Sequence, residues 1–193
     1  MRSVPTQTNR ARFTYMKPIH LATLALATTA SAAAFATQYL TVEQAQRAMF
    51  PDASAFRDAS LQLSTEQMHQ VEKLAGLPAR SVNWRVFAAL KGDTPLGYMI
   101  LDDVIGKFEL ISYAVAVNPD ASIRQVEILT YRESHGFEVR NAAWRKQFAG
   151  KSVQAGLSVG EGIANISGAT LSCTHLTDGV RRIAAVAQVA LRK

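Results

Sequence analysis

Cysteine is nearly absent from this sequence, which has one, Cys173, among 193 residues. A single cysteine excludes an internal disulfide, a four-cysteine zinc site and a Cys-x-x-Cys-His haem attachment. With 48% hydrophobic residues, the chain is still long enough to bury a core that needs no disulfide or metal.

Acidic residues are absent before Glu43, whereas Arg2, Arg10, Arg12 and Lys17 all lie in that stretch. The whole chain has 21 basic and 15 acidic residues, and its formal charge of +6 is typical of a nucleic-acid binder. Without the first 32 residues, 17 basic residues face the same 15 acidic ones, so the balance falls to about +2. No basic stripe remains, and we therefore expect no nucleic-acid partner.

Charge of either sign is missing from residues 18–36, which follow the basic stretch. Residues 19–30 have the length of a secretory hydrophobic region, and small residues at 30–32 and 34–36 fit a cleavage site. The alternative is an uncleaved anchor, but a membrane span needs about 20 apolar residues and His20 interrupts this run. We therefore expect residues 1–36 to be a signal peptide or an N-terminal membrane anchor, with cleavage favoured. Either form predicts a periplasmic protein, soluble after cleavage or anchored to the inner membrane.

The rest of the chain predicts a single α+β domain that begins with an N-terminal helical segment, residues 37–79. Two capping-box patterns, Thr41–Gln44 and Ser64–Gln67, open the expected helices of this segment. Pro51 ends the first helix, and Gly76 ends the second.

From residue 80 to residue 193 the pattern predicts a sheet followed by helices. Short turns separate the strands, so we expect an antiparallel meander, because parallel strands would need long crossovers. Trp144 and Phe148 mark a short helix by their spacing. Period-two or apolar runs place the strands at residues 82–90, 98–101, 108–117 and 122–131.

The C-terminal helix is the clearest element of the sequence. An apolar face repeats at helical spacing from Leu176 to Leu191. Arg181, Arg182 and Arg192 are expected off that face. An amphipathic helix of this kind predicts one side packed on the sheet.

Small residues and hydroxyls gather just before this helix, in Ser167, Gly168, Ala169 and Thr170. Gly168 and Ala169 would let the backbone approach a bulky ligand, and free N–H groups at a helix start favour an anion. A phosphate at or beside Thr170 is therefore chemically sensible. The alternative on these residues alone is a turn whose Ser or Thr caps the helix.

Residues 162–182 resemble the flavin-attachment motif of the FMN-binding domain family. That family includes the G subunit of Rnf electron-transport complexes and the C subunit of the sodium-pumping NADH:quinone oxidoreductase. In the family, the last Thr of Ser-Gly-Ala-Thr carries FMN through a phosphoester bond that a dedicated flavin transferase installs. The resemblance implies FMN attached covalently to Thr170, with Ser167, Gly168, Ala169 and Ser172 as further cofactor-binding residues.

The resemblance covers about residues 80–191, most of the chain after the leader. Glu133, Ser134, His135 and Gly136 match a loop that lies beside the flavin in the family, and Glu133 and Gly136 are the residues expected to contact it. Many members have an acidic residue three positions before the motif Ser, where this chain has Ala164.

Two other residues near these motifs have an alternative interpretation. Tyr131 either stacks on the flavin ring or packs in the core. Cys173 is either a redox-active thiol near a helix start or a small buried residue. The second interpretation is preferred for Cys173, because the chain has no partner cysteine.

Two classes of function follow. The first is an exported flavoprotein that carries electrons between membrane or haem redox partners, with a flavin transferase as its maturation partner. The second is a non-redox ligand-binding or accessory module that retains the fold without flavin, and Ala164 is the feature that supports it. The sequence has no pocket signature for an organic substrate, so we expect a carrier rather than an enzyme with its own reaction.

Overall fold

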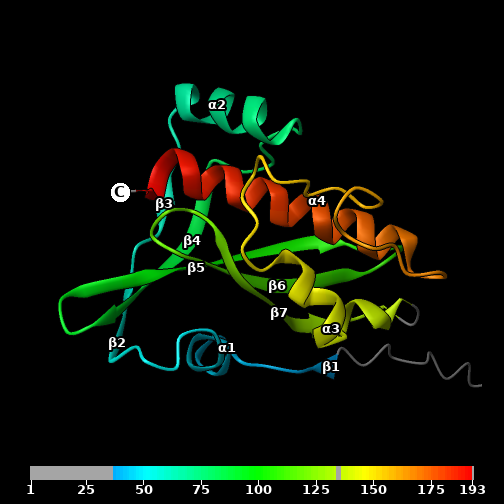
Figure 1. Cartoon of the computed structure of the whole chain (residues 1–193), viewed down its shortest axis with the longest axis horizontal. Helices are drawn as coiled ribbons and strands as arrows, with labels where there is room; N and C mark the ends of the chain where they lie inside the picture. Colours follow the sequence, from blue (N-terminus) through cyan, green and yellow to red (C-terminus); the bar gives the residue numbers. More distant parts are fainter. Residues whose placement is uncertain (1–36, 134–135, 193) are drawn as a thin grey trace, which may run out of the picture. The chain divides into compact units, whose positions relative to one another are not determined.

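An antiparallel sheet forms the centre of the computed structural model, which describes residues 37–133 and 136–192 (Figure 1). The strand order is β1-β7-β6-β5-β4-β2, and a short strand, β3, also pairs with β4. The four long strands β4 to β7 are consecutive neighbours, so the predicted α+β meander is confirmed. The strands are β1 (Thr37–Gln38), β2 (Ala55–Asp58), β3 (Leu61–Gln62), β4 (Asn83–Lys91), β5 (Thr94–Ile105), β6 (Leu110–Val117) and β7 (Ile123–Tyr131).

The predicted leader, residues 1–36, and the loop residues Ser134 and His135 lie outside the described residues. Among the helices that the structure does describe, none is both long and apolar enough to cross a membrane.

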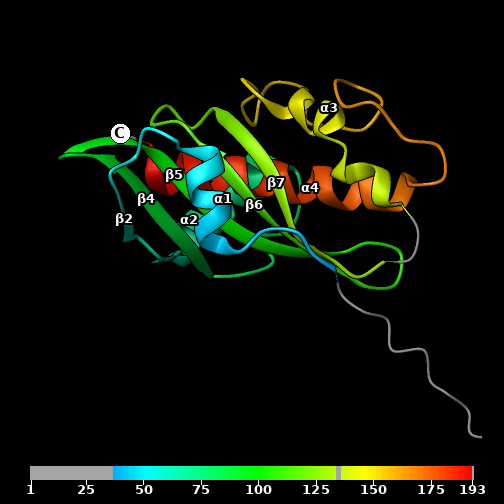
Figure 2. The same cartoon turned by 90° about the horizontal axis from the view of Figure 1, so that it is seen from below.

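Helices cover both faces of the sheet (Figures 1 and 2). The C-terminal helix α4 (Thr170–Val186) lies along one face, and α2 (Thr65–Ala75) packs against α4. The other face is covered by α1 (Val42–Met49). The predicted helix at Trp144 is present as α3 (Ala142–Arg145), which continues into the 3-10 turn η2 (Lys146–Phe148).

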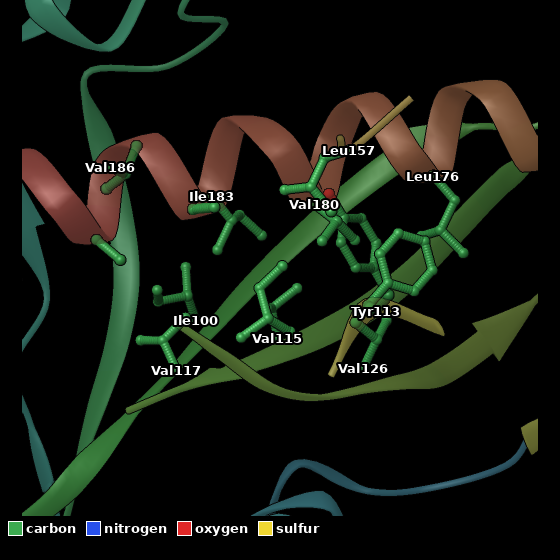
Figure 3. Packing of buried hydrophobic residues seen from close by; sticks show 14 of the residues in the cluster. Ile100, Tyr113, Val115, Val117, Val126, Leu157, Leu176, Val180, Ile183 and Val186 are labelled. Carbon is green, nitrogen blue, oxygen red and sulfur yellow. The ribbon is translucent and has the colours of Figure 1, made fainter. Parts of the chain in front are cut away.

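The main core lies between α4 and the sheet (Figure 3). Val180 and Ile183 point from α4 toward Ile100 and Val115 of the sheet, and all four are fully buried. Burial of one such side chain stabilises the fold by roughly 1.5–3 kcal/mol. This packing fixes the position of α4, and with it the position of the Thr170 segment.

Both predicted capping boxes are present. Thr41 and Gln44 cap α1 reciprocally, and Ser64 and Gln67 do the same for α2. Gly76 ends α2 in the left-handed conformation, with a φ of 63°. The helix starts were therefore readable from local sequence.

Two features of the fold differ from the sequence-based expectation. Residues 37–79 contribute three short strands besides their two helices. Arg182 is not off the buried face of the C-terminal helix: it is only 6% exposed. As the apolar repeat to Leu191 predicts, the helical backbone extends past Val186, through the π-helical turn η3 (Ala187–Leu191).

Candidate functional site

The start of α4 lies at one end of the sheet, together with the β5–β6 connection and the start of the 3-10 helix η1 (Phe137–Arg140) (Figures 1 and 2). A pocket of about 210 Å³ opens between these segments. It is lined by Lys107, Gly136, Gly168, Ala169, Thr170, Leu171 and Ser172. Five of the seven predicted cofactor-binding residues therefore meet around one cavity.

Thr170 is the first residue of α4 and its side chain is exposed. Asn165 Nδ2 donates a hydrogen bond to Thr170 Oγ1 at 3.2 Å. Gly168 precedes it with a φ of 84°, a left-handed conformation that glycine adopts at little cost. The segment thus presents one accessible, oriented hydroxyl at the pocket.

No side chain caps the start of α4, where the N-cap residue is Ala169. The capping alternative that the sequence left open is therefore wrong for this helix, since neither Ser167 nor Thr170 caps it. Uncapped N–H groups at a helix start favour an anionic group by about 0.3–1 kcal/mol, and more where partly buried. Lys107 adds a positive charge to the pocket lining.

Ser172, the other hydroxyl of this turn, is only 3% exposed. It forms a hydrogen bond with the Tyr131 hydroxyl. Burial raises the pKa of Tyr131, and the hydrogen bond with Ser172 opposes that shift. Tyr131 lies in the main core cluster, which favours the core interpretation over ring stacking.

Gly136 lies against α4 with a φ of 75°. A Cβ at this position would lie 2.9 Å from Ser172 Oγ and 3.1 Å from the Tyr131 hydroxyl. The structure therefore explains the glycine by the close approach of the loop to α4, at the wall of the pocket.

Glu133 does not line the pocket, although it was predicted to contact the cofactor. Its side chain is buried, and its Oε1 accepts hydrogen bonds from the backbone N–H groups of Phe108 and Glu109. The carboxylate therefore holds the β5–β6 connection that carries Lys107. Ser167 is exposed and also lies outside the lining.

Sequence reasoning missed the residues that hold the segment before Thr170. The Trp144 indole N–H donates to the Ala164 carbonyl oxygen at 2.7 Å, and Gln147 Oε1 accepts from the Ala164 N–H at 2.8 Å. Both backbone groups of Ala164 are thereby fixed. The helical spacing of Trp144 indicated a buried residue but not this contact.

Cys173 is fully buried in the main core. Burial raises the pKa of its thiol. Both observations fit the small buried residue that the sequence favoured, because a reactive thiol needs access and a lowered pKa.

A larger cavity, of about 570 Å³, lies between β7 and η1. None of the predicted cofactor-binding residues lines it. Its size alone does not make it the functional site, because the accessible hydroxyl and the uncapped helix start are at the smaller pocket.

The site thus defines a domain that can hold an anionic group at a helix start. Residues 106–185 match the family model described as the FMN-binding domain. The resemblance stated from the sequence is therefore confirmed for this segment, which includes Thr170, Gly136 and Lys107.

Individual proteins resemble the chain less closely than the family model does. Six chains of solved structures match, and one is NqrC of Shewanella oneidensis. The two chains share 15% sequence identity with a TM-score of 0.46, over 75% of this chain and 82% of NqrC. No curated protein sequence matches the chain.

Proposed function

We propose that this chain is an exported flavoprotein that carries electrons, with FMN attached covalently to Thr170 through a phosphoester. The observation that supports the proposal is the accessible Thr170 hydroxyl beside the uncapped start of α4, within the segment that matches the FMN-binding domain. The phosphoester would join Thr170 Oγ1 to the phosphate of FMN. A flavin transferase would form it from an activated donor of FMN, in which a phosphoanhydride bond breaks as the Thr170 hydroxyl loses its proton.

The pocket fits one part of the cofactor. A volume of about 210 Å³ is smaller than the roughly 300–1,000 Å³ of pockets that enclose a whole ligand of this kind. The phosphate end would lie in the pocket, near the N–H groups of the first turn of α4 and near Lys107.

The surroundings of the pocket offer apolar surface for the remainder of the cofactor. Leu171 is 47% exposed and Phe108 is 73% exposed. Bound FMN supplies the electron-transfer chemistry, since its ring accepts and donates electrons. The chain's own residues hold the phosphate and keep the attachment residue oriented.

Covalent attachment has a physical reason in an exported carrier. The interaction of a helix start with a phosphate is worth about 1 kcal/mol, which cannot prevent a cofactor from dissociating. A phosphoester at Thr170 would retain the flavin outside the cytoplasm. We therefore propose membrane or periplasmic electron-transfer proteins as the partners.

The colour of the purified protein tests this function. The exported chain is produced together with a flavin transferase and examined by visible absorption and by flavin fluorescence after denaturing gel electrophoresis. A yellow chain that keeps its flavin on the gel, bleaches on reduction and recovers on reoxidation supports the proposal. A colourless chain contradicts the proposal. It favours the alternative that Ala164 supports, a non-redox module that retains the fold without flavin.

The mass of the intact exported chain tests the proposed location. A chain that begins after Ala32 or Ala36 indicates a cleaved signal peptide and a soluble periplasmic protein. A chain that retains the hydrophobic region, residues 19–30, and fractionates with membranes indicates an anchor. Recovery of the unprocessed chain in the cytoplasm contradicts export.

A further inference from the structure

A second pocket, of about 220 Å³, lies farther along α4, beside the end of β5. It shares no lining residue with the pocket at Thr170. Its lining consists of Arg80, Val104, Ile105, His175, Asp178 and Arg182.

Arg182 is the unusual member of this lining, because it is a cation that is only 6% exposed. Its Nε donates to the Pro78 carbonyl oxygen at 2.9 Å. Its Nη1 has no hydrogen-bond partner, and it forms no ion pair with any carboxylate of residues 37–133 and 136–192. Buried cations are normally paired directly, and this guanidinium has no carboxylate within ion-pair distance among the described residues.

The two carboxylates nearby are engaged elsewhere. Asp178 Oδ1 pairs with Arg181 Nη2 at 3.0 Å. Asp102 accepts a hydrogen bond from the Tyr113 hydroxyl at 2.6 Å, and burial raises the pKa of its carboxyl. The charges of both carboxylates act on Arg182, but neither carboxylate forms an ion pair or a hydrogen bond with it.

A second cation reaches the same pocket from another part of the chain. Arg80 is exposed, and its Nη1 contacts the Asp103 carbonyl oxygen at 3.4 Å, a weak hydrogen bond. Two guanidinium groups thus line one small cavity, and the planar fork of a guanidinium suits the oxygens of a carboxylate or a phosphate.

His175 closes the pocket toward the β5–β6 connection. Its Nδ1 lies 2.6 Å from the Ile105 carbonyl oxygen and 3.0 Å from that of Gly106. Carbonyl oxygens only accept, so Nδ1 carries the proton.

We propose that this pocket binds the oxyanion group, phosphate or carboxylate, of a small molecule between Arg80 and Arg182. Buried Val104 and half-exposed Ile105 form an apolar wall for the body of such a molecule. The bound oxyanion would form the direct ion pair that Arg182 makes with no carboxylate of the described residues. The site is separate from the FMN attachment site and does not depend on it.

Calorimetric titration of the purified protein with inorganic phosphate and with succinate tests the proposal. Both titrations are made in chloride buffer of matched ionic strength. We expect saturable binding of at least one probe with one equivalent per chain. Phosphate alone indicates a phosphate group as the natural ligand, and succinate indicates a carboxylate. The absence of saturable binding by either probe overturns the proposal.

Variants locate the binding. Arg182→Gln should weaken the affinity at least about tenfold, because it removes a buried charge from the ligand. Arg80→Gln should weaken the affinity several-fold. Because Arg80 is exposed, this variant should fold, so it tests the proposal even if Arg182→Gln does not fold. Arg192→Gln is the matched control, because Arg192 is an exposed arginine that does not line the pocket. Unchanged binding in Arg80→Gln overturns the proposal, and so does an equal loss in Arg192→Gln.

Discussion

Two hydroxyl side chains two residues apart, those of Thr170 and Ser172, differ in their access to solvent. Thr170 is exposed at the first position of α4, whereas Ser172 is 3% exposed and hydrogen-bonded to Tyr131. An enzyme that modifies a hydroxyl must reach it, so access favours Thr170.

Asn165 is expected to orient the Thr170 hydroxyl for attachment. Its Nδ2 donates to Thr170 Oγ1, so Asn165→Ala removes the group that orients the attachment residue. A hydrogen bond of this kind is worth about 0.5–1.5 kcal/mol, so the initial rate of flavin incorporation should fall roughly two- to tenfold. The melting temperature should change little, because both side chains are exposed.

Asn165→Asp is the matched control for that experiment. An aspartate can accept a hydrogen bond from the Thr170 hydroxyl, so this variant should incorporate flavin faster than Asn165→Ala. In-gel flavin fluorescence over time gives both rates. If Asn165→Ala incorporates flavin as fast as the unmodified chain, Asn165 does not position the hydroxyl.

Part of the site was predictable from individual residues. The motif placed Gly168, Ala169 and Thr170 together before the last helix, and the structure places all three in the lining of one pocket. The role of Glu133 was not predictable, because its carboxylate binds backbone N–H groups 24 and 25 residues away. Long-range contacts of this kind leave no local pattern in a single sequence.

At the scale of one element, α4 contains a glycine in its interior, Gly179, which lies against Tyr113 of β6. A Cβ there would lie 2.1 Å from the hydroxyl oxygen of Tyr113 and 3.0 Å from Cζ. Tyr113 is fully buried and donates to Asp102, so its ring has no space to move aside. The glycine lets α4 approach β6.

Gly179→Ala should therefore destabilise the protein despite the helix preference of alanine. In an isolated helix the change would gain about 1 kcal/mol, but overpacking a core costs about 1–3 kcal/mol and displaces the Tyr113 hydrogen bond as well. We expect a net loss in the free energy of unfolding, measured by urea titration. Thr174→Ala, on the same helix and half-buried, should change it by less than about 0.5 kcal/mol. A Gly179→Ala protein as stable as the unmodified chain would contradict this packing.

The elements themselves were largely predictable, and the exceptions have physical reasons. Capping boxes and period-two runs are local, so α1, α2 and strands β4 to β7 could be expected from the sequence. Strands β1 and β3 have two residues each, and β2 has four, which is too short for a readable alternation. Arg182 was misplaced because helical periodicity does not show that a charged residue at the margin of an apolar face is covered by neighbours.

For the whole molecule, we expect the free energy of unfolding to depend on pH through the ionisation of Asp102. Burial raises the pKa of this carboxyl above its ordinary 3.8, although Tyr113 donates to it. The folded state then holds the proton more tightly than the unfolded state. This contribution to the free energy of unfolding is fully present below about pH 3.8. It is lost as the pH rises through the pKa of Asp102 in the folded state.

Asp102→Asn should remove that loss, because an asparagine keeps an acceptor for Tyr113 and carries no charge. Urea titrations of both proteins over the acidic range measure the difference in their free energies of unfolding. The gain of Asp102→Asn over the unmodified chain should grow as the pH rises and then stay constant. A gain that shrinks with rising pH would mean that Asp102 is stabilised as the ionised form.

The attachment of FMN to Thr170 is tested most directly by peptide mapping of the protein produced with a flavin transferase. Fragment ions distinguish Thr170 from Ser172, because Leu171 lies between them. We predict the FMN phosphate mass on Thr170, its complete absence in folded Thr170→Val, and its retention in Ser172→Ala. FMN found on Ser172, or a Thr170→Val protein that keeps covalent flavin, would contradict the account.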